Sequence, residues 1–413
     1  MKLLKSPIMN RIQKKLNFLF KLISKIAKSK EINIVTLSSY STQLGFLVAS
    51  NYHFAISKRI SDPKSLYLLF IFPSTADKKL NNILKNNPEK NNSNNFIKIK
   101  INSIPKRLLV SPALFCLFIL NYWKKIYLWQ TRYRWINDAL SFKSSSIKLP
   151  VPFFKKILFG DGFLNLMPFD KPSWLVKKNE SKASLIKNND LHCSYHLFDI
   201  QDQESKLNSI KINKDFVRNT LINHIKNKND FELSKVLDYI FKLNDKKIKF
   251  NKGIFIFPTT TFAETNRTTI DEEIEMYINY LKKCDLNSYD YLLIKPHPGS
   301  QKIKNKTFYE KLKNNKSYSK LSIIDPYPNY SNFCLGNIPL EIICTYIIEY
   351  VKPDNLTFAC CSTATLSTKN IFPEVNVKKA FGSSLIKKYI DKDFIDQRLA
   401  QESMIEKKIN LLN

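Results

Sequence analysis

Short apolar runs alternate with helical patterns through the second half of the chain, and this alternation constrains the fold more than any other feature. The runs lie at 253–257, 289–294, 321–324, 356–360 and 375–381. Their short length and bulky apolar composition predict buried strands. Strands separated by helices pair in parallel, because a parallel connection needs a crossover. We therefore expect a Rossmann-like sheet, and the lack of a GxGxxG fingerprint argues against a dinucleotide such as NAD.

The first half shows the same alternation, with predicted strands at 32–37, 66–72, 96–101 and 156–159. A chain of 413 residues is too long for a single core. We predict an α/β protein with two Rossmann-like parallel domains. The predicted divisions are a basic amphipathic segment at 1–30, a first domain at 31–170, a helical connection at 171–250, a second domain at 251–382 and terminal helices at 383–413.

The chain is strongly basic, with 66 Lys and Arg against 35 Asp and Glu and a formal net charge of +31. The lysines are spread over the whole length, arginines are few, and no zinc-finger, helix-turn-helix or RNA-recognition signature occurs. We therefore expect no nucleic-acid partner. A basic surface serves equally well for anionic membranes or anionic sugars.

The cysteines and the N-terminal residues indicate the cellular compartment of the protein. Seven cysteines form no CxxC pair, and several lie in apolar runs, which indicates buried thiols in a reducing environment. The first 30 residues lack the apolar core and small-residue cleavage site of a secretory signal. We expect a cytoplasmic protein with no metal centre, because no cluster of metal ligands is evident.

The N-terminal segment has a helical pattern of its own. Apolar residues recur at three- and four-residue spacing, with lysines between them, at Ile8, Ile12, Leu16, Leu19, Ile23 and Ile26. The pattern fits a helix in the interface of an anionic inner membrane, and it equally fits a helix docked on its own domain. A second apolar stretch at 108–123 contains Pro112 and is short for a membrane span, so we predict a core helix there.

One histidine stands in a rigid loop directly after a predicted strand, within Lys295-Pro296-His297-Pro298. Each proline fixes its own φ and disfavours helix in the residue before it. His297 is therefore held in an extended loop at the carboxyl end of a strand, where ligands bind in open α/β sheets. The alternative is a stiff strand exit with an ordinary surface histidine.

Two further motifs take equivalent places later in the chain. Glu341 opens a predicted helix after Pro339, and the Ser362-Thr363 pair opens another after a strand. A helix N-terminus with hydroxyl groups favours an anion. Taken singly, Ser362 is explained by N-capping and Glu341 by compensation of the helix dipole. The coincidence of three such positions favours a ligand site.

Together these motifs resemble the bacterial lipooligosaccharide sialyltransferase and polysialyltransferase group. That group carries an acidic-acidic-Gly motif, a His-Pro motif and a Ser-Ser/Thr motif in this order. The corresponding stretches here are Gly160-Asp161-Gly162, His297-Pro298 and Ser362-Thr363, within a likeness that spans roughly residues 31 to 385. The first acidic position is a glycine in this chain, so the support that a neighbouring carboxylate would give Asp161 is missing.

The resemblance implies a GT-B architecture, in which two Rossmann-like parallel α/β/α domains face a central cleft, and an inverting, metal-independent glycosyltransferase without a cofactor. Sialic acid, or a related nonulosonic acid, would pass from a CMP-activated donor to a glycan or glycolipid acceptor such as a lipooligosaccharide or capsule chain. Asp161 of the first, acceptor-side domain would be the base, and His297 of the second, donor-binding domain would stabilise the departing phosphate.

The resemblance also implies the remaining site residues. Glu341 would accept hydrogen bonds from the ribose hydroxyls, and the other donor-binding residues would be Pro298, Ser362 and Thr363. Thr42 and Gln43, which follow the opening strand, would lie on the acceptor side.

Two other functions remain open at this point. One is a different GT-B transferase, such as a glycerol-phosphate polymerase of the wall teichoic acid type, which also places histidines beside phosphates. The other is a non-enzymatic protein that binds polyanions or membranes, which the net charge and the amphipathic N-terminus would favour. Neither the acceptor nor the linkage can be read from these residues.

Overall fold

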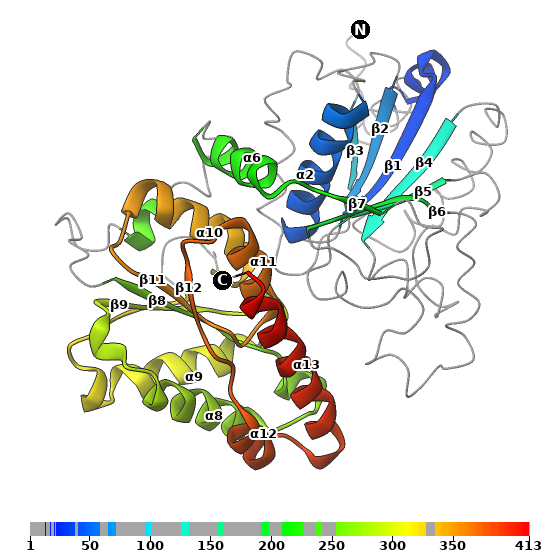
Figure 1. Ribbon diagram of the computed structural model, residues 1–413. Coiled ribbons are helices and arrows are strands. Elements are labelled where there is room, and N and C mark those ends of the chain that lie inside the picture. Colours follow the sequence, from blue (N-terminus) through cyan, green and yellow to red (C-terminus); the bar gives the residue numbers. More distant parts are fainter. Residues whose placement is uncertain are drawn as a thin grey trace, which may run out of the picture.

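The structure is a computed structural model of the 413-residue chain. It describes residues 13, 17, 20, 22–37, 40–57, 65–71, 96–100, 125–131, 155–159, 191–197, 209–226, 237–241, 253–327 and 335–412. These residues form two parallel sheets with helices packed against them (Figure 1). The predicted fold class, an α/β protein with two parallel Rossmann-like domains, is confirmed. The cleft between them stays a prediction.

The first sheet has seven strands in the order β3-β2-β1-β4-β5-β6-β7, and every pair is parallel. The strands are β1 (Glu31–Leu37), β2 (Ser65–Ile71), β3 (Phe96–Lys100), β4 (Lys125–Thr131), β5 (Lys155–Phe159), β6 (Leu191–His196) and β7 (Ser209–Lys211). Helix α2 (Tyr40–Ser57) packs on one face, where Phe46 lies edge-on against Trp129 at a centroid distance of 5.4 Å. The Trp129 indole also donates to Asn33 Oδ1 at 2.8 Å, so its polar edge is satisfied inside the sheet.

The second sheet has five strands in the order β10-β9-β8-β11-β12, again all parallel. They are β8 (Ile254–Pro258), β9 (Tyr291–Lys295), β10 (Ser322–Ile324), β11 (Leu356–Ala359) and β12 (Asn376–Lys378). Both faces are buried, as a continuous apolar strand requires. Ile254 and Ile256 point into one core and Phe255 and Phe257 into the other. The core on the Phe255 side includes α8 (Ile270–Lys283) and α9 (Lys302–Lys313).

The remaining helices of this domain are α10 (Leu340–Tyr346), α11 (Thr363–Ile371), α12 (Ser383–Tyr389) and α13 (Lys392–Asn410). Helix α10, which continues as a π-helical turn to Val351, packs with the Ile254 side of the sheet. Helix α11 follows β11, and α12 and α13 end the chain. Helix α8 begins with a capping box, in which the Thr269 side chain accepts from the Glu272 N–H and the Glu272 side chain accepts from the Thr269 N–H.

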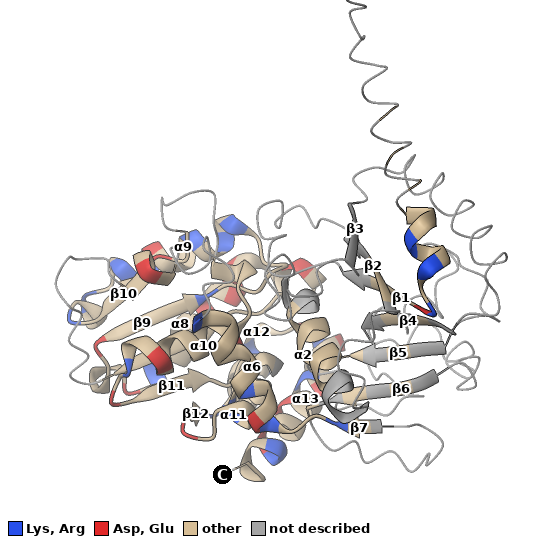
Figure 2. Ribbon diagram, turned by 90° about the horizontal axis from the view of Figure 1, so that it is seen from above, with Lys and Arg blue, Asp and Glu red and all other residues tan. Residues whose placement is uncertain are grey.

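Helix α6 (Lys214–Lys226) lies between the two sheets in both views of the molecule (Figures 1 and 2). Its Phe216 ring meets Tyr52 of the first domain at 5.1 Å. On the other side, Arg218 pairs with Glu374 at 2.6 Å in a two-pronged contact. The two domains therefore share one hydrophobic core through α6 rather than meeting only at their surfaces.

The chain between 171 and 250 differs from the predicted helical connection. Helix α6 and the stretch 237–241 are helical, but β6 and β7 are strands that extend the first sheet. Their sequences carry polar residues and are short, so they gave no apolar run to recognise. Strand β4 was also not predicted, although it is the neighbour of β1. The predicted core helix at 108–123 lies outside the described residues, and the exact domain boundaries stay predictions.

The N-terminal helical stretch at 22–28 packs on the protein with part of its apolar face. Leu22 and Ile26 are buried, whereas Phe20 and Ile23 are exposed. For the residues that the structure describes, this burial supports the prediction of a helix docked on its own domain. Binding to an anionic membrane stays a prediction, which co-sedimentation with anionic vesicles would test. Among the described helices, none combines the length and the apolar character that crossing a membrane requires.

Acid should destabilise the packing of α6 between the two domains. His224 of α6 is only 4% exposed, and burial lowers its pKa to about 4. An unfolded histidine has a pKa of about 6.5, so between these values the unfolded state takes up a proton that the folded state does not. Stability is therefore present above pH 6.5 and is lost as the pH falls. We expect the ionisation of His224 to lower the free energy of unfolding by about 2 kcal/mol between pH 7 and pH 5.

Urea unfolding at both pH values measures this loss in the wild type and in His224→Gln. The substitution should flatten the pH dependence, and an unchanged slope would contradict the assignment. His297→Gln is the matched comparison and should flatten it less, because His297 is exposed.

Candidate functional site

Three loops leave the carboxyl edge of the second sheet. Register pairs Pro258 of β8 with Lys295 of β9, and Ile256 of β8 with Phe358 of β11. Strands β9 and β11 lie about 10 Å apart, two strand spacings, with β8 between them. Thr260, His297 and Ser362 belong to the loops that follow these three strands.

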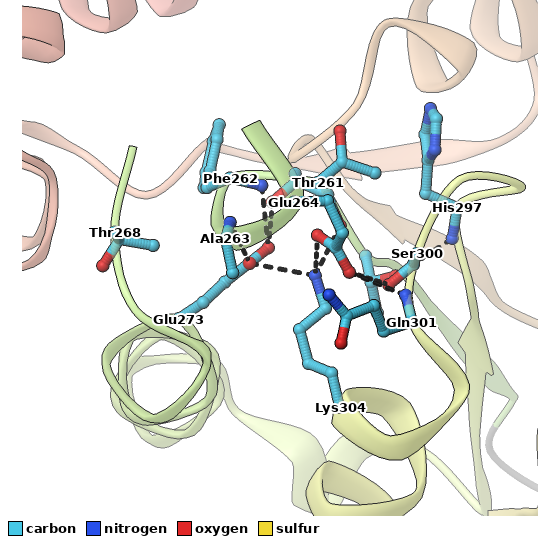
Figure 3. A network of polar contacts seen from close by, with 12 residues as sticks. Thr261, Phe262, Ala263, Glu264, Thr268, Glu273, His297, Ser300, Gln301 and Lys304 are labelled. Atoms are coloured by element: carbon cyan, nitrogen blue, oxygen red, sulfur yellow. Dashed lines mark hydrogen bonds and ion pairs between the residues drawn. The ribbon is translucent and has the colours of Figure 1, made fainter. Parts of the chain in front are cut away.

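The β8 loop is fixed by a buried lysine from α9 (Figure 3). Lys304 is 0% exposed, and its Nζ donates to Thr260 O at 3.0 Å, Glu264 Oε2 at 2.8 Å and Glu273 Oε2 at 2.9 Å. An ammonium has three donors, and here each has an acceptor. A buried charge is tolerated only when it is paired and hydrogen-bonded in this way. Lys304 thus joins α8, α9 and the loop after β8.

Glu273 of α8 anchors the same loop from the other side. Its carboxylate accepts from Thr260 Oγ1 at 2.7 Å, from the Ala263 N–H at 2.8 Å and from the Phe262 N–H at 3.3 Å. The Tyr277 hydroxyl also donates to it. Burial, together with the neighbouring carboxylate, raises the pKa of Tyr277 well above its ordinary value, so this hydroxyl keeps its proton and remains a donor.

Glu264 links the β8 loop to the histidine loop. Its Oε1 accepts from the Gln301 N–H at 2.7 Å and from Ser300 Oγ at 3.2 Å. Burial alone would raise the pKa of Glu264, but Lys304 and the Gln301 N–H outweigh it and hold the pKa below its usual range. The carboxylate also compensates the N-terminal dipole of α9, whose Gln301 cap makes no side-chain hydrogen bond.

His297 is held by its backbone and by its ring. Its N–H donates to Thr259 Oγ1 at 3.0 Å, and its Nδ1 accepts from the Gly299 N–H at 3.0 Å. Figure 3 shows the ring pointing away from the Lys304–Glu264 pair. Desolvation by the loop, then the positive charges of Lys295 and Lys304, lower the pKa of His297 to about 4. The ring is exposed, which moderates desolvation, so we conclude only that the imidazole is neutral at neutral pH.

The α10 and α11 residues meet through a hydrogen bond. Ser367 of α11 donates to the Glu341 carboxylate in the first turn of α10. Lys295, two residues before the histidine, donates through Nζ to Gly336 O at 3.0 Å, just before α10. These contacts bring the start of α10 to the edge of the sheet that carries His297.

Ser362 is the N-cap of α11, where its Oγ accepts from the Ala364 N–H at 3.3 Å. Behind it, Arg398 of α13 donates to Cys361 O at 3.3 Å and lies 4.9 Å from the Phe262 ring centroid. The C-terminal helix therefore supports both the β8 loop and the start of α11.

The structure places some of the predicted site residues and leaves others undescribed. His297 and Pro298 follow β9 and Ser362 follows β11, so their loops leave the same edge of the second sheet, whereas Glu341 lies in the first turn of α10 and Thr363 begins α11. Gly160 and Asp161 lie outside the described residues, directly after β5. Thr42 and Gln43 are in α2, but their side chains are not described. Within the described parts of the chain, no three His, Cys, Asp or Glu side chains are grouped to hold a metal ion.

Sequence reasoning missed the polar cluster formed by Thr260, Glu264, Glu273 and Lys304. One signal for it exists in the helical spacing. Lys304 stands four residues before Phe308 and eight before Leu312, and Glu273 has the same relation to Tyr277 and Leu281. A charge on an apolar stripe is a candidate for burial, and opposite charges on two adjacent helices are candidates for a pair.

Comparison with known proteins gives distant likenesses only. No protein-family model matches the chain, and no curated protein does so either. Among solved structures, the UDP-GlcNAc 2-epimerase of Methanocaldococcus jannaschii is 13% identical over 84% of this chain and 82% of its own, with a TM-score of 0.43. The UDP-GlcNAc 2-epimerase of Neisseria meningitidis bound to UDP-GlcNAc is 10% identical over 81% and 79%, with a TM-score of 0.44.

The wall teichoic acid polymerase TagF is 13% identical over 89% of this chain and 77% of its own, with a TM-score of 0.34. All three likenesses are too weak to carry an argument about function. The fold assignment therefore rests on the two parallel sheets, and the functional assignment rests on the site residues.

Loss of the buried lysine should destabilise the protein strongly. Lys304→Met keeps the aliphatic stem but leaves Glu273, which is 0% exposed, without its cation. We expect a loss of about 3 to 5 kcal/mol in the free energy of unfolding, as for other broken buried pairs. Urea denaturation measures this loss.

Lys311→Met is the matched control on the same helix, because Lys311 pairs with Glu275 at the surface with 41% and 47% of the side chains exposed. That change should cost no more than about 1 kcal/mol. Equal costs for the two variants would show that the Lys304 cluster does not hold the loop.

Proposed function

We propose that the protein is an inverting glycosyltransferase that transfers sialic acid, or a related nonulosonic acid, from a CMP-activated donor to a glycan acceptor. The observation that carries the proposal is that the loops of His297 and Ser362 leave the same carboxyl edge of the second sheet, with Glu341 of α10 hydrogen-bonded to Ser367 of α11. Ligands of open α/β sheets bind at this edge. The matching order of the sequence motifs supports the sialyltransferase class in particular.

The electrostatics of the edge suit a phosphate. Lys295 and Lys304 disfavour a positive imidazole at His297 and would favour an arriving anion, while Glu264 and Glu273 act in the opposite direction. Departure of CMP from the sugar leaves negative charge on the phosphate, and donors fixed in advance stabilise that charge as it develops. In this proposal His297 donates to a phosphate oxygen, with Ser362 and the start of α11 as further donors.

Glu341 is assigned to the ribose. Its carboxylate accepts from Ser367, and a carboxylate has further lone pairs for the two ribose hydroxyls. Asp161 is assigned as the base that takes the proton of the acceptor hydroxyl. It follows β5 in the first sheet, so base and leaving-group stabiliser come from different domains. The acceptor would be a glycan or glycolipid, with Thr42 and Gln43 on its side.

The nucleotide should be recognised as a cytidine. We expect CMP to raise the melting temperature of the protein more than UMP or AMP at equal concentration, because a ligand that binds the folded state more tightly stabilises it more. The same protein should transfer labelled sialic acid from CMP-sialic acid to a member of a lactoside and sialoside panel. Equal shifts for the three nucleotides without transfer would favour a general polyanion binder. CMP selectivity with transfer of glycerol phosphate instead would favour a polymerase of the teichoic acid type.

Two substitutions should separate the two catalytic roles. Asp161→Asn should abolish transfer while the affinity for CMP stays nearly unchanged, since the donor is held by the other domain. His297→Ala should lower kcat by about 100-fold or more, as loss of a leaving-group stabiliser does, while the urea midpoint stays close to that of the wild type. Retained activity in Asp161→Asn would make Gly160-Asp161-Gly162 an ordinary turn.

A further inference from the structure

A backbone N–H group in the histidine loop determines which nitrogen of the His297 ring carries the proton. Nδ1 of His297 accepts a hydrogen bond from the Gly299 N–H at 3.0 Å. A nitrogen that accepts cannot carry a proton, so the neutral ring has its proton on Nε2. The tautomer is thus set by a backbone group two residues further along, within the turn closed by the Ser300 N–H and His297 O at 2.9 Å.

The backbone of the same residue is held by a second device. Thr259 is 1% exposed, and its hydroxyl accepts from the His297 N–H at 3.0 Å while it donates to Asn305 Oδ1 at 3.3 Å. Asn305 in turn donates from Nδ2 to Ser300 Oγ at 3.0 Å, which is part of the histidine loop. The hydroxyl therefore serves as acceptor for the loop and donor to α9 in one fixed orientation.

We propose that this loop fixes His297 as the neutral Nε2–H tautomer, so that the ring donates a hydrogen bond without giving up its proton, and that Thr259 is the positioning residue for it. The tautomer follows from the loop geometry alone. The role of the Nε2–H group as donor to the leaving phosphate rests on the proposed function.

The arrangement opposes use of His297 as a general acid. Protonation of Nδ1 would turn it from an acceptor into a donor facing the Gly299 N–H, so the imidazolium would lose one hydrogen bond and bring two N–H groups together. A neutral donor needs no such change during the reaction. The phosphate of a CMP leaving group is a weak base at neutral pH and can depart without a proton, so a hydrogen bond from Nε2 is sufficient.

The tautomer can be read directly from the ring nitrogens. Protein labelled with ¹⁵N-histidine has five histidines, and His297→Gln identifies the signals of His297 by their loss. At pH 7 we expect Nε2 to show the shift of a protonated nitrogen and Nδ1 that of an unprotonated acceptor. An Nδ1–H tautomer, an even mixture of tautomers or an imidazolium at this pH would overturn the proposal.

Thr259 is tested with a matched pair of variants. Thr259→Val keeps the shape but removes the hydroxyl, and Thr259→Ser keeps the hydroxyl. In Thr259→Val the His297 ring signals should move toward those of a free mixture of tautomers, whereas Thr259→Ser should retain the wild-type signals. Wild-type ring signals in Thr259→Val would reject the positioning role. Should Thr259→Val fail to fold, displaced signals in Thr259→Ser would reject it equally.

The NMR and kinetic results are independent of each other, so the two proposals can fail separately. Without transferase activity, the tautomer is still decided by the spectra. With activity, Thr259→Val should lower kcat about 10-fold with little change in KM for the donor, and Thr259→Ser should stay within a few-fold of the wild type. A donor role also predicts that His297→Gln, which offers a side-chain N–H, keeps more activity than His297→Ala. Equal activities would overturn the donor role alone.

Discussion

The ammonium of Lys304 is the contact on which the geometry of the site depends. It satisfies its three donors with one carbonyl and two carboxylates, and these acceptors belong to α8 and to the loop after β8. A buried ion pair adds little net stability over an apolar replacement, because desolvation consumes most of the attraction. Its contribution is orientation. Lys304 holds one oxygen of Glu264. The other oxygen accepts from Gln301 and Ser300, and these hydrogen bonds fix the position of the histidine loop.

Much of the second domain could be predicted from the sequence, because its strands are buried on both faces and its helices carry caps and apolar stripes. The first sheet was harder for a physical reason. Strand β4 begins with Lys125 and follows a long aromatic stretch, so its bounds had no turn signal. Strands β6 and β7 lie at one edge of the sheet, where fewer side chains are buried and polar residues are tolerated. Their apolar alternation is correspondingly weak.

The sequence marks candidate site residues where the local backbone chemistry is distinctive, and it does not mark residues whose burial depends on tertiary contacts. His297 stands between two prolines, and Ser362 caps a helix, and both features are local. Lys304 is one lysine among many in a lysine-rich chain. Its place on the apolar stripe of α9 is a weak local signal, and the packing of α9 against α8 separates it from solvent-exposed neighbours such as Lys311. Thr259 carries no local mark beyond its place after a strand. Its role follows from a register between strands that are far apart in sequence.

Helix α6 connects the two sheets. Its ion pair from Arg218 to Glu374 and its packing against α10 and α11 attach it to the second domain. Those two helices also carry Glu341 and Ser362, and the hydrogen bond from Ser367 to Glu341 joins them. The chain reaches α6 directly from β7 of the first sheet. Helix α6 therefore links the first sheet to the two helices that carry Glu341 and Ser362, and a packing defect in α6 would act on those helices without touching any ligand.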